Sequence, residues 1–139
     1  GLSPGITMHN VRQDMRQFLG EAALSMARAD WIAVHGYWIN EREMTDITGG
    51  FTWKVFRQLF PDKLLIITEF GNPLQPKQSV AEQYARYYGI LRHIPGLGGA
   101  FAYISSTSDR VESARWAWRD ETGQDVGIAS EIGLRRFIH

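Results

Sequence analysis

The hydrophobic positions of this chain follow two alternating patterns, one with the period of a helix and one typical of a buried strand. Near the amino terminus, apolar residues recur at intervals of three or four and predict one face of a helix: Val11, Met15, Phe18, Ala22 and Met26. Residues 31–34 are then continuously apolar and end at the polar His35. This run indicates a short strand followed by a loop at its carboxyl end.

The same two patterns repeat along the rest of the sequence. Residues 51–60 predict a second helix, which ends at Pro61 because proline cannot continue it. Residues 64–68 form a second apolar run of strand length. The remaining elements are a helical stripe over residues 80–91, a strand over residues 100–104 and a helix that begins at Ser130.

Strands that alternate with helices predict parallel strands joined by right-handed crossovers. The predicted strands begin 33 positions apart (Trp31 to Leu64) and then 36 positions apart (Leu64 to Ala100). A barrel of about 250 residues has roughly 31 residues per unit. We therefore predict an α/β fold, a segment of a (β/α)8 TIM barrel over residues 1–139 without an internal domain boundary. A doubly wound sheet stays an alternative, although no Gly-rich phosphate loop follows a predicted strand.

Three strands make less than half of a barrel, and parallel strands buried on both faces need neighbours on either side. We therefore expect the segment to pair with the remainder of a parent barrel or with a second copy of the chain. The sequence begins at Gly1 without a methionine, and we interpret it as a processed or excised piece.

Composition narrows the possible partners. Lys plus Arg and Asp plus Glu both total 15, so the formal net charge is zero and predicts no nucleic-acid partner. No apolar run reaches the roughly 20 residues that cross a bilayer, so we expect no membrane partner. The absence of Cys excludes disulfides and thiolate metal sites without choosing a compartment, and a secreted parent is compatible with it. The scattered His residues lack metal-ligand spacing, so we expect neither metal nor cofactor.

Polar residues follow each predicted strand, at the end where a barrel gathers its active site. The most conspicuous is Glu69, which comes directly after five apolar strand residues. A carboxylate in such a place is costly unless it is used or paired. Glu69 is therefore either a functional carboxylate or the partner of a neighbouring Arg in a salt bridge that closes the barrel end.

Three short motifs resemble clan A glycoside hydrolases, the group that holds many cellulases and mannanases. Residues 65–71, Leu-Ile-Ile-Thr-Glu-Phe-Gly, resemble their seventh strand, and residues 34–37, Val-His-Gly-Tyr, resemble their sixth. Residues 99–103 resemble the start of the eighth. The resemblance runs through positions 31–105. It implies that the chain is the C-terminal half of the barrel, roughly strands 6 to 8 with their helices.

The resemblance also implies a retaining hydrolase of β-linked glycans with Glu69 as the catalytic nucleophile. Tyr37 would donate a hydrogen bond to Glu69, and His35 would orient the carboxylate or contact the sugar. The plain alternatives are a packing role for Tyr37 and a satisfied strand-end histidine for His35.

Aromatic faces suit stacking on sugar rings, and we expect three tryptophans to bind the carbohydrate substrate. Trp38 lies in the loop after the first strand. The family often has a Trp at the end of strand eight, where residues 104–106 of this chain read Ile-Ser-Ser. Trp116 or Trp118 from the following excursion would then substitute for it.

The second carboxyl group of a retaining mechanism is missing from the motifs. The family supplies its acid/base from an Asn-Glu pair that ends strand four, which would lie upstream of Gly1. Glu41 and Glu43 lie in the loop after the first strand and could approach the site as an alternative acid/base, but neither matches that motif. We therefore expect the chain alone to be inactive on unactivated oligosaccharides. A catalytically silent carbohydrate-binding barrel and a structural half-barrel that forms a symmetric dimer stay open as alternative functions.

Overall fold

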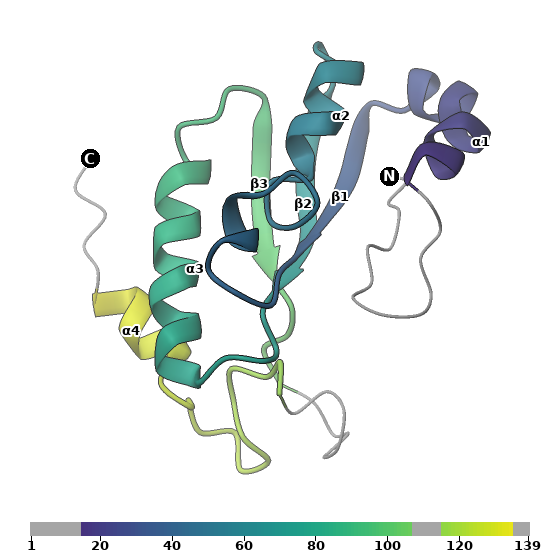
Figure 1. Ribbon diagram of the computed structural model, residues 1–139. Helices are drawn as coiled ribbons and strands as arrows, with labels where there is room; N and C mark the ends of the chain where they lie inside the picture. Colours follow the sequence, from purple (N-terminus) through teal and green to yellow (C-terminus); the bar gives the residue numbers. More distant parts are fainter. Residues whose placement is uncertain (1–14, 107–114, 135–139) are drawn as a thin grey trace.

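The computed structural model describes residues 15–106 and 115–134. Within these ranges the helices and strands follow one another in this order (Figure 1): α1 (Met15–Arg28), β1 (Trp31–Tyr37), the short 3-10 helix η1 (Glu43–Thr45), α2 (Trp53–Leu59), β2 (Leu64–Gly71), α3 (Lys77–Leu91), β3 (Leu97–Ala102) and α4 (Ile128–Leu134).

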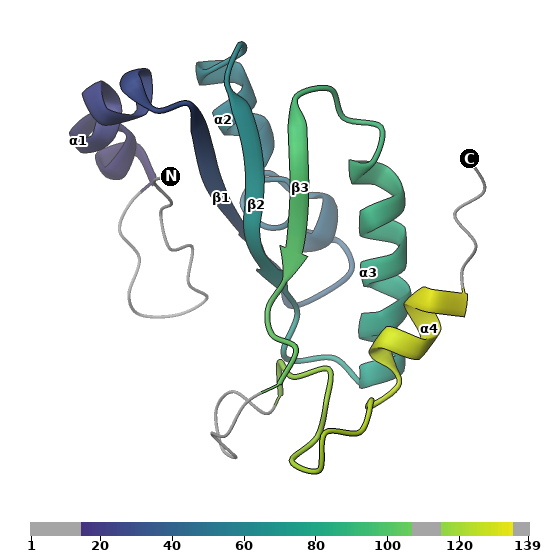
Figure 2. The same cartoon turned by 180° about the vertical axis from the view of Figure 1, so that it is seen from behind.

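The strands form one parallel sheet with β2 between β1 and β3. Helices α2 and α3 lie over one face of the sheet, and α4 packs against α3 (Figure 1). Figure 2 shows the opposite face, over which no helix of the described residues lies. The predicted α/β fold with parallel strands is confirmed. Closure of these strands into a half or whole barrel stays a prediction.

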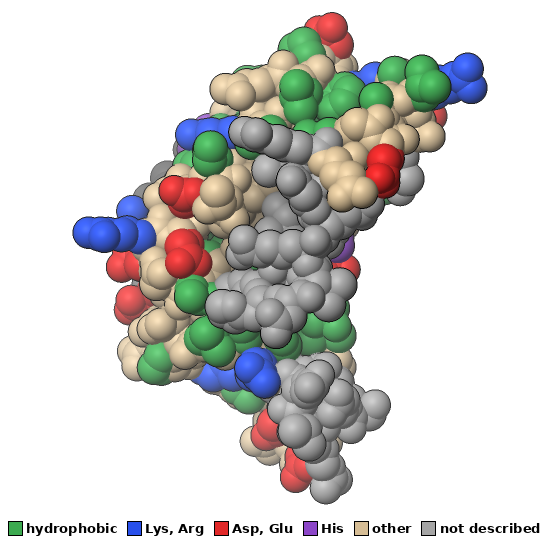
Figure 3. Space-filling model, turned by 45° about the vertical axis from the view of Figure 1, so that its right-hand side comes forward, with side chains coloured by type: hydrophobic (Ala, Val, Ile, Leu, Met, Phe, Trp, Pro, Cys, Tyr) green, Lys and Arg blue, Asp and Glu red, His purple; other side chains and the backbone are tan. Residues whose placement is uncertain are grey.

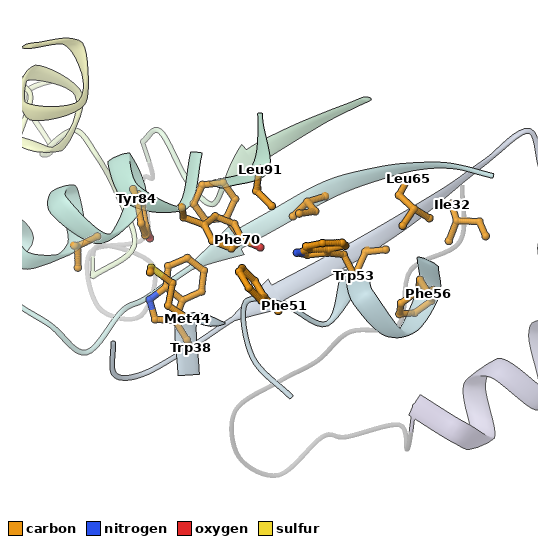
Figure 4. Close-up of a cluster of buried hydrophobic side chains, with 14 of the residues drawn as sticks. Ile32, Trp38, Met44, Phe51, Trp53, Phe56, Leu65, Phe70, Tyr84 and Leu91 are labelled. Atoms are coloured by element: carbon orange, nitrogen blue, oxygen red, sulfur yellow. The ribbon is translucent and has the colours of Figure 1, made fainter. Parts of the chain in front are cut away.

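The hydrophobic core fills the layer between the sheet and the helices α2 and α3 (Figure 4). Ile32 of β1, Leu65 of β2 and Phe56 of α2 are completely buried in it. Aromatic rings occupy the part of this layer near the carboxyl ends of the strands. There Trp38 stacks on Phe70, with ring centroids 5.8 Å apart and planes only 7° from parallel. This packing fixes the loops that leave β1 and β2.

At the amino-terminal end of the sheet, two cationic side chains bind backbone carbonyls of the connecting turns. The guanidinium of Arg57 donates hydrogen bonds to the carbonyls of Lys63 (2.7 Å) and Gly96 (2.8 Å). The ammonium of Lys63 donates to the carbonyls of Ala27 (2.8 Å) and Ala29 (2.7 Å), at the end of α1. These bonds tie together the turns that precede all three strands.

The third strand begins earlier than the sequence predicted. β3 starts at Leu97 rather than at residue 100, because the glycines that read as chain breakers lie within the strand. A Cβ on Gly98 would be 3.1 Å from the side chain of Leu64, so glycine allows this close packing between neighbouring strands. The start of the first predicted helix, at Val11, lies outside the described residues.

Charged side chains of both signs are interspersed on the molecular face in Figure 3, and neither sign gathers into one large patch there. This distribution agrees with the formal net charge of zero. Among the described residues, no helix is both long and apolar enough to cross a membrane.

Candidate active site

One extra residue in β2 sets the direction of Glu69. Val34 of β1 is in register with Ile67, and the next residue, His35, is in register with Glu69. Thr68 therefore has no partner on β1, and the register with β3 shifts at the same place. This arrangement is a β-bulge, which breaks the alternation of side chains along the strand.

The bulge changes which residues of β2 face the helices. Before it, Leu65 and Ile67 point into the helix-covered layer and are completely buried. After it, Phe70 takes this position and is also completely buried. Glu69 consequently faces the uncovered side of the sheet, where its side chain is 37% exposed. Unbroken alternation would have placed the carboxylate in the apolar layer.

Glu69 contacts two side chains of β1. The hydroxyl of Tyr37 donates a hydrogen bond to Oε2 of Glu69, and Nδ1 of His35 lies 3.5 Å from the same oxygen. Within the described residues no Arg or Lys forms an ion pair with Glu69, so the salt bridge considered above is not seen there. The structure brings together the three residues that the strand pattern predicted for one face.

Burial controls the protonation of both partners of the carboxylate. Desolvation lowers the pKa of His35 and outweighs the charge of Glu69, which raises it. His35 is therefore neutral at neutral pH. Desolvation also raises the pKa of Tyr37 far above its ordinary value, and the hydrogen bond to Glu69 raises it further. Tyr37 thus keeps its proton and remains a donor to the carboxylate at physiological pH.

Trp116 lies next to this group. Its ring makes an edge contact with Tyr37, with centroids 5.1 Å apart, and a second one with Tyr103, at 5.9 Å. A Cβ on Gly71 would be 3.0 Å from the indole, so the missing side chain there leaves room for Trp116. The indole is partly exposed. An aromatic surface therefore lies beside the tyrosine that binds Glu69.

The other two tryptophans predicted to bind substrate take part in core packing. Trp38 is completely buried, and its Nε1 donates a 2.7 Å hydrogen bond to Gln83. Trp118 packs against the core, with its ring centroid 6.0 Å from that of Tyr84. Trp38 could meet a ligand only if the core opened. We therefore leave both residues out of the substrate site proposed below.

The acidic residues of the loop after β1 make contacts elsewhere. Glu41 forms an ion pair with Arg86 of α3, with 2.5 Å between the charged atoms. Glu43 accepts hydrogen bonds from the backbone of Ile39 (3.1 Å) and from the side chain of Asn40 (2.7 Å). These bonds order the loop. The described part of the chain contains no group of three His, Asp or Glu residues that could hold a metal ion.

Two features of the site were not predicted from the sequence. Asn72, directly after β2, and Trp38 both donate hydrogen bonds to Oε1 of Gln83 on α3, at 3.0 and 2.7 Å. The only sign of this network in the sequence was Gln83 itself, a polar residue inside an apolar helical stripe. Lys77, at the start of α3, binds the two backbone carbonyls on either side of Trp116. The sequence around Lys77 gives no sign that it binds carbonyls 38 and 40 residues further along the chain.

Comparison with solved structures shows that the fold is similar to that of a glycoside hydrolase. A similar structure is the crystal structure of a GH128 (subgroup VI) exo-beta-1,3-glucanase from Aureobasidium namibiae, with a TM-score of 0.62 at 12% sequence identity. The match covers 90% of this chain and 48% of the glucanase chain, so this chain spans about half the length of its structural neighbour. No protein-family model matches the sequence, and no curated protein matches it. At this identity the likeness concerns the fold alone and does not single out clan A.

Proposed function

We propose that this chain carries the nucleophile of a retaining β-glycoside hydrolase. The observation that carries the proposal is the setting of Glu69, a partly exposed carboxylate near the carboxyl end of a parallel strand, hydrogen-bonded by Tyr37 and close to His35. Barrel enzymes have their active sites at this end of the strands. The fold of the exo-beta-1,3-glucanase supports a β-linked glucan as the substrate class.

In the proposed reaction a carboxylate oxygen of Glu69 attacks the anomeric carbon of the sugar. The bond from that carbon to the leaving-group oxygen breaks, and the leaving oxygen takes a proton from an acid/base carboxyl group. Water then hydrolyses the glycosyl-enzyme. Tyr37 and His35 both approach Oε2, which leaves Oε1 as the attacking oxygen. The hydrogen bond from Tyr37 holds Oε2 in place while Oε1 attacks.

The acid/base carboxyl group must lie about 5–5.5 Å from the nucleophile in a retaining enzyme. Glu41 and Glu43 are held by Arg86 and by their own loop, and we propose neither. We propose instead that this group lies on a segment of the natural protein that precedes the chain, as the family resemblance implies. The complete protein is then the catalyst, and this chain alone does not cleave unactivated oligosaccharides.

Trp116 is the proposed sugar-stacking residue of the site. It is partly exposed, and its ring contacts Tyr37, which in turn binds Glu69. A sugar ring stacked on the exposed part of the indole would lie near the carboxylate that Tyr37 binds. Trp116 thus takes the part that the resemblance gives to a tryptophan at the end of the eighth strand.

Chemical rescue of Glu69→Gly in the complete natural protein tests the nucleophile. The substrate is an aryl β-glucoside with a good leaving group, which departs with little acid assistance. We expect the variant to lose activity and sodium azide to restore it, because azide enters the space left by the carboxylate. The product should be the α-glycosyl azide, since attack comes from the face opposite the leaving group. A β-glycosyl azide would identify Glu69 as the acid/base instead.

Glu69→Gln separates a catalytic role from a structural one. The amide keeps the size of the side chain but removes the charge and the nucleophile, so we expect turnover to fall about 10³-fold or more. The melting temperature should change little, because the side chain faces the uncovered side of the sheet. Glu41→Gln is the matched control and should leave turnover unchanged. A destabilised but active Glu69→Gln variant would make Glu69 a scaffold residue. A wild-type protein that binds glucan without hydrolysing it would support the silent binding alternative.

A further inference from the structure

Lys77 is tied to the segment that presents Trp116. Its ammonium donates hydrogen bonds to the backbone carbonyls of Arg115 (2.7 Å) and Ala117 (2.9 Å), the residues before and after the tryptophan. The residues after β3 also bind this segment: Ile104 N donates to the carbonyl of Trp116 over 3.4 Å, and Trp118 N donates to the carbonyl of Ile104 at 3.0 Å. Among the described residues, the two bonds from Lys77 are thus the shorter attachments of residues 115–117.

The surroundings of Lys77 fit an anchoring role. The residue opens α3, which packs on the sheet directly after the loop that leaves β2. Burial of the side chain lowers the pKa of the Lys77 ammonium, and a charge is tolerated in such a place when carbonyl oxygens compensate for lost water. On the other side of the indole, Gly71 and Tyr37 limit where the ring can lie.

We propose that Lys77 is a positioning residue that fixes the indole of Trp116 as a stacking surface for a sugar ring beside Glu69. This inference rests on the proposed glycosidase function. The bonds of Lys77 to Arg115 and Ala117 go to backbone carbonyls and not to the carboxylate of Glu69. Loss of Lys77 should therefore weaken substrate binding through Trp116 and leave the chemical step nearly unchanged.

Lys63 provides a matched control. It also donates two hydrogen bonds from its ammonium to backbone carbonyls, those of Ala27 and Ala29, but at the opposite end of the strands. Lys77→Met and Lys63→Met thus make the same chemical change to the same kind of clamp. A purely structural role predicts that both variants lose stability and that neither changes KM specifically.

The test measures KM, kcat and melting temperature of the complete natural protein with β-1,3- and β-1,4-linked glucan oligosaccharides. For Lys77→Met we expect KM to rise by about five- to tenfold with kcat within about twofold of wild type. Lys77→Arg, which can still donate to both carbonyls, should restore most of the affinity. Lys63→Met should keep the wild-type KM.

A double variant checks that Lys77 acts through the indole. Trp116→Ala should raise KM at least as much as Lys77→Met, and adding Lys77→Met to it should cause no further rise, because residues that act as a unit are not additive. Equal KM values for Lys77→Met and Lys63→Met, or full additivity with Trp116→Ala, would overturn the inference and leave the proposed function intact. A wild-type protein that neither binds nor cleaves any of these oligosaccharides would overturn both.

Discussion

Tyr37 and Glu69 lie 32 positions apart in the sequence and are joined by a hydrogen bond between neighbouring parallel strands. The donor is half-buried, and its burial raises its pKa well beyond the physiological range. The acceptor is a carboxylate on the uncovered side of the sheet. The pair therefore combines a fixed proton donor with an accessible anion, and it is the part of the site most open to direct test.

Replacing Tyr37 with Phe should slow catalysis by the complete natural protein without a large change in KM. A hydrogen bond to a charged group contributes about 2 kcal/mol, which corresponds to roughly a 30-fold fall in kcat if the bond acts in the transition state. Tyr88→Phe is the control, because its hydroxyl is bonded to the backbone of Ala102, on the helix-covered side. Steady-state kinetics on both variants check the prediction. An unchanged kcat in Tyr37→Phe would mean that this tyrosine only packs.

The lowered pKa of His35 predicts a loss of stability in acid. The folded protein binds the proton less readily than the unfolded chain, whose histidine titrates near pH 6.5. This contribution to stability is therefore complete above about pH 6.5 and decreases as the pH falls toward the lower folded-state pKa. His35→Asn should flatten the pH dependence of the unfolding free energy in that range, as measured by denaturant titration. The exposed His93→Asn is the control, and identical curves for His35→Asn and wild type would contradict the prediction.

Gln83 holds together the two loops that frame the site, and Gln83→Met should disturb both. The substitution keeps the length of the side chain but leaves the buried donors of Trp38 and Asn72 without their acceptor. Two unsatisfied buried groups cost about 1–3 kcal/mol each, so we expect a loss of about 3 kcal/mol in unfolding free energy. Gln78→Met, exposed on the same helix, should change it by less than about 0.5 kcal/mol. Equal losses of unfolding free energy in the two variants would show that the hydrogen bonds of Gln83 contribute little to stability.

Phe101 reports on whether the sheet closes into a barrel. The residue lies on β3 with 60% exposure, while Ala100 and Ala102 on either side pack toward the helices. If further strands cover the open face in the complete natural protein, Phe101→Asp buries an unpaired charge and should lower the melting temperature by more than about 10 °C. The exposed Leu59→Asp on α2 is the control. A Phe101→Asp variant as stable as wild type would mean that this face stays open.

The sequence pattern was sufficient for the order of the elements and the direction of the strands. Apolar runs beginning at Trp31 and Leu64 are the observed starts of β1 and β2. The pattern also predicted that His35, Tyr37 and Glu69 share a face, because strand ends converge in a parallel sheet. It could not reveal the bulge, since an extra residue inside a continuously apolar run leaves no break in periodicity.

The tryptophans show a second limit of sequence interpretation. Trp38, Trp116 and Trp118 all lie in segments that read as polar loops, yet Trp38 is completely buried and Trp118 packs against the core. Trp116 differs because Gly71 leaves space beside it and Lys77 holds the flanking backbone. These neighbours come from distant parts of the chain, so local composition does not distinguish one indole from another.

The bulge at Thr68 amounts to one inserted residue in a strand that is otherwise regular. If that one residue were deleted, Ile67 would be followed directly by Glu69, and regular alternation would still place Glu69 opposite His35 on the uncovered side. A related chain could therefore present the same glutamate from a regular strand that is one residue shorter. A one-residue alignment gap before this glutamate is consequently no sign that the site has been lost.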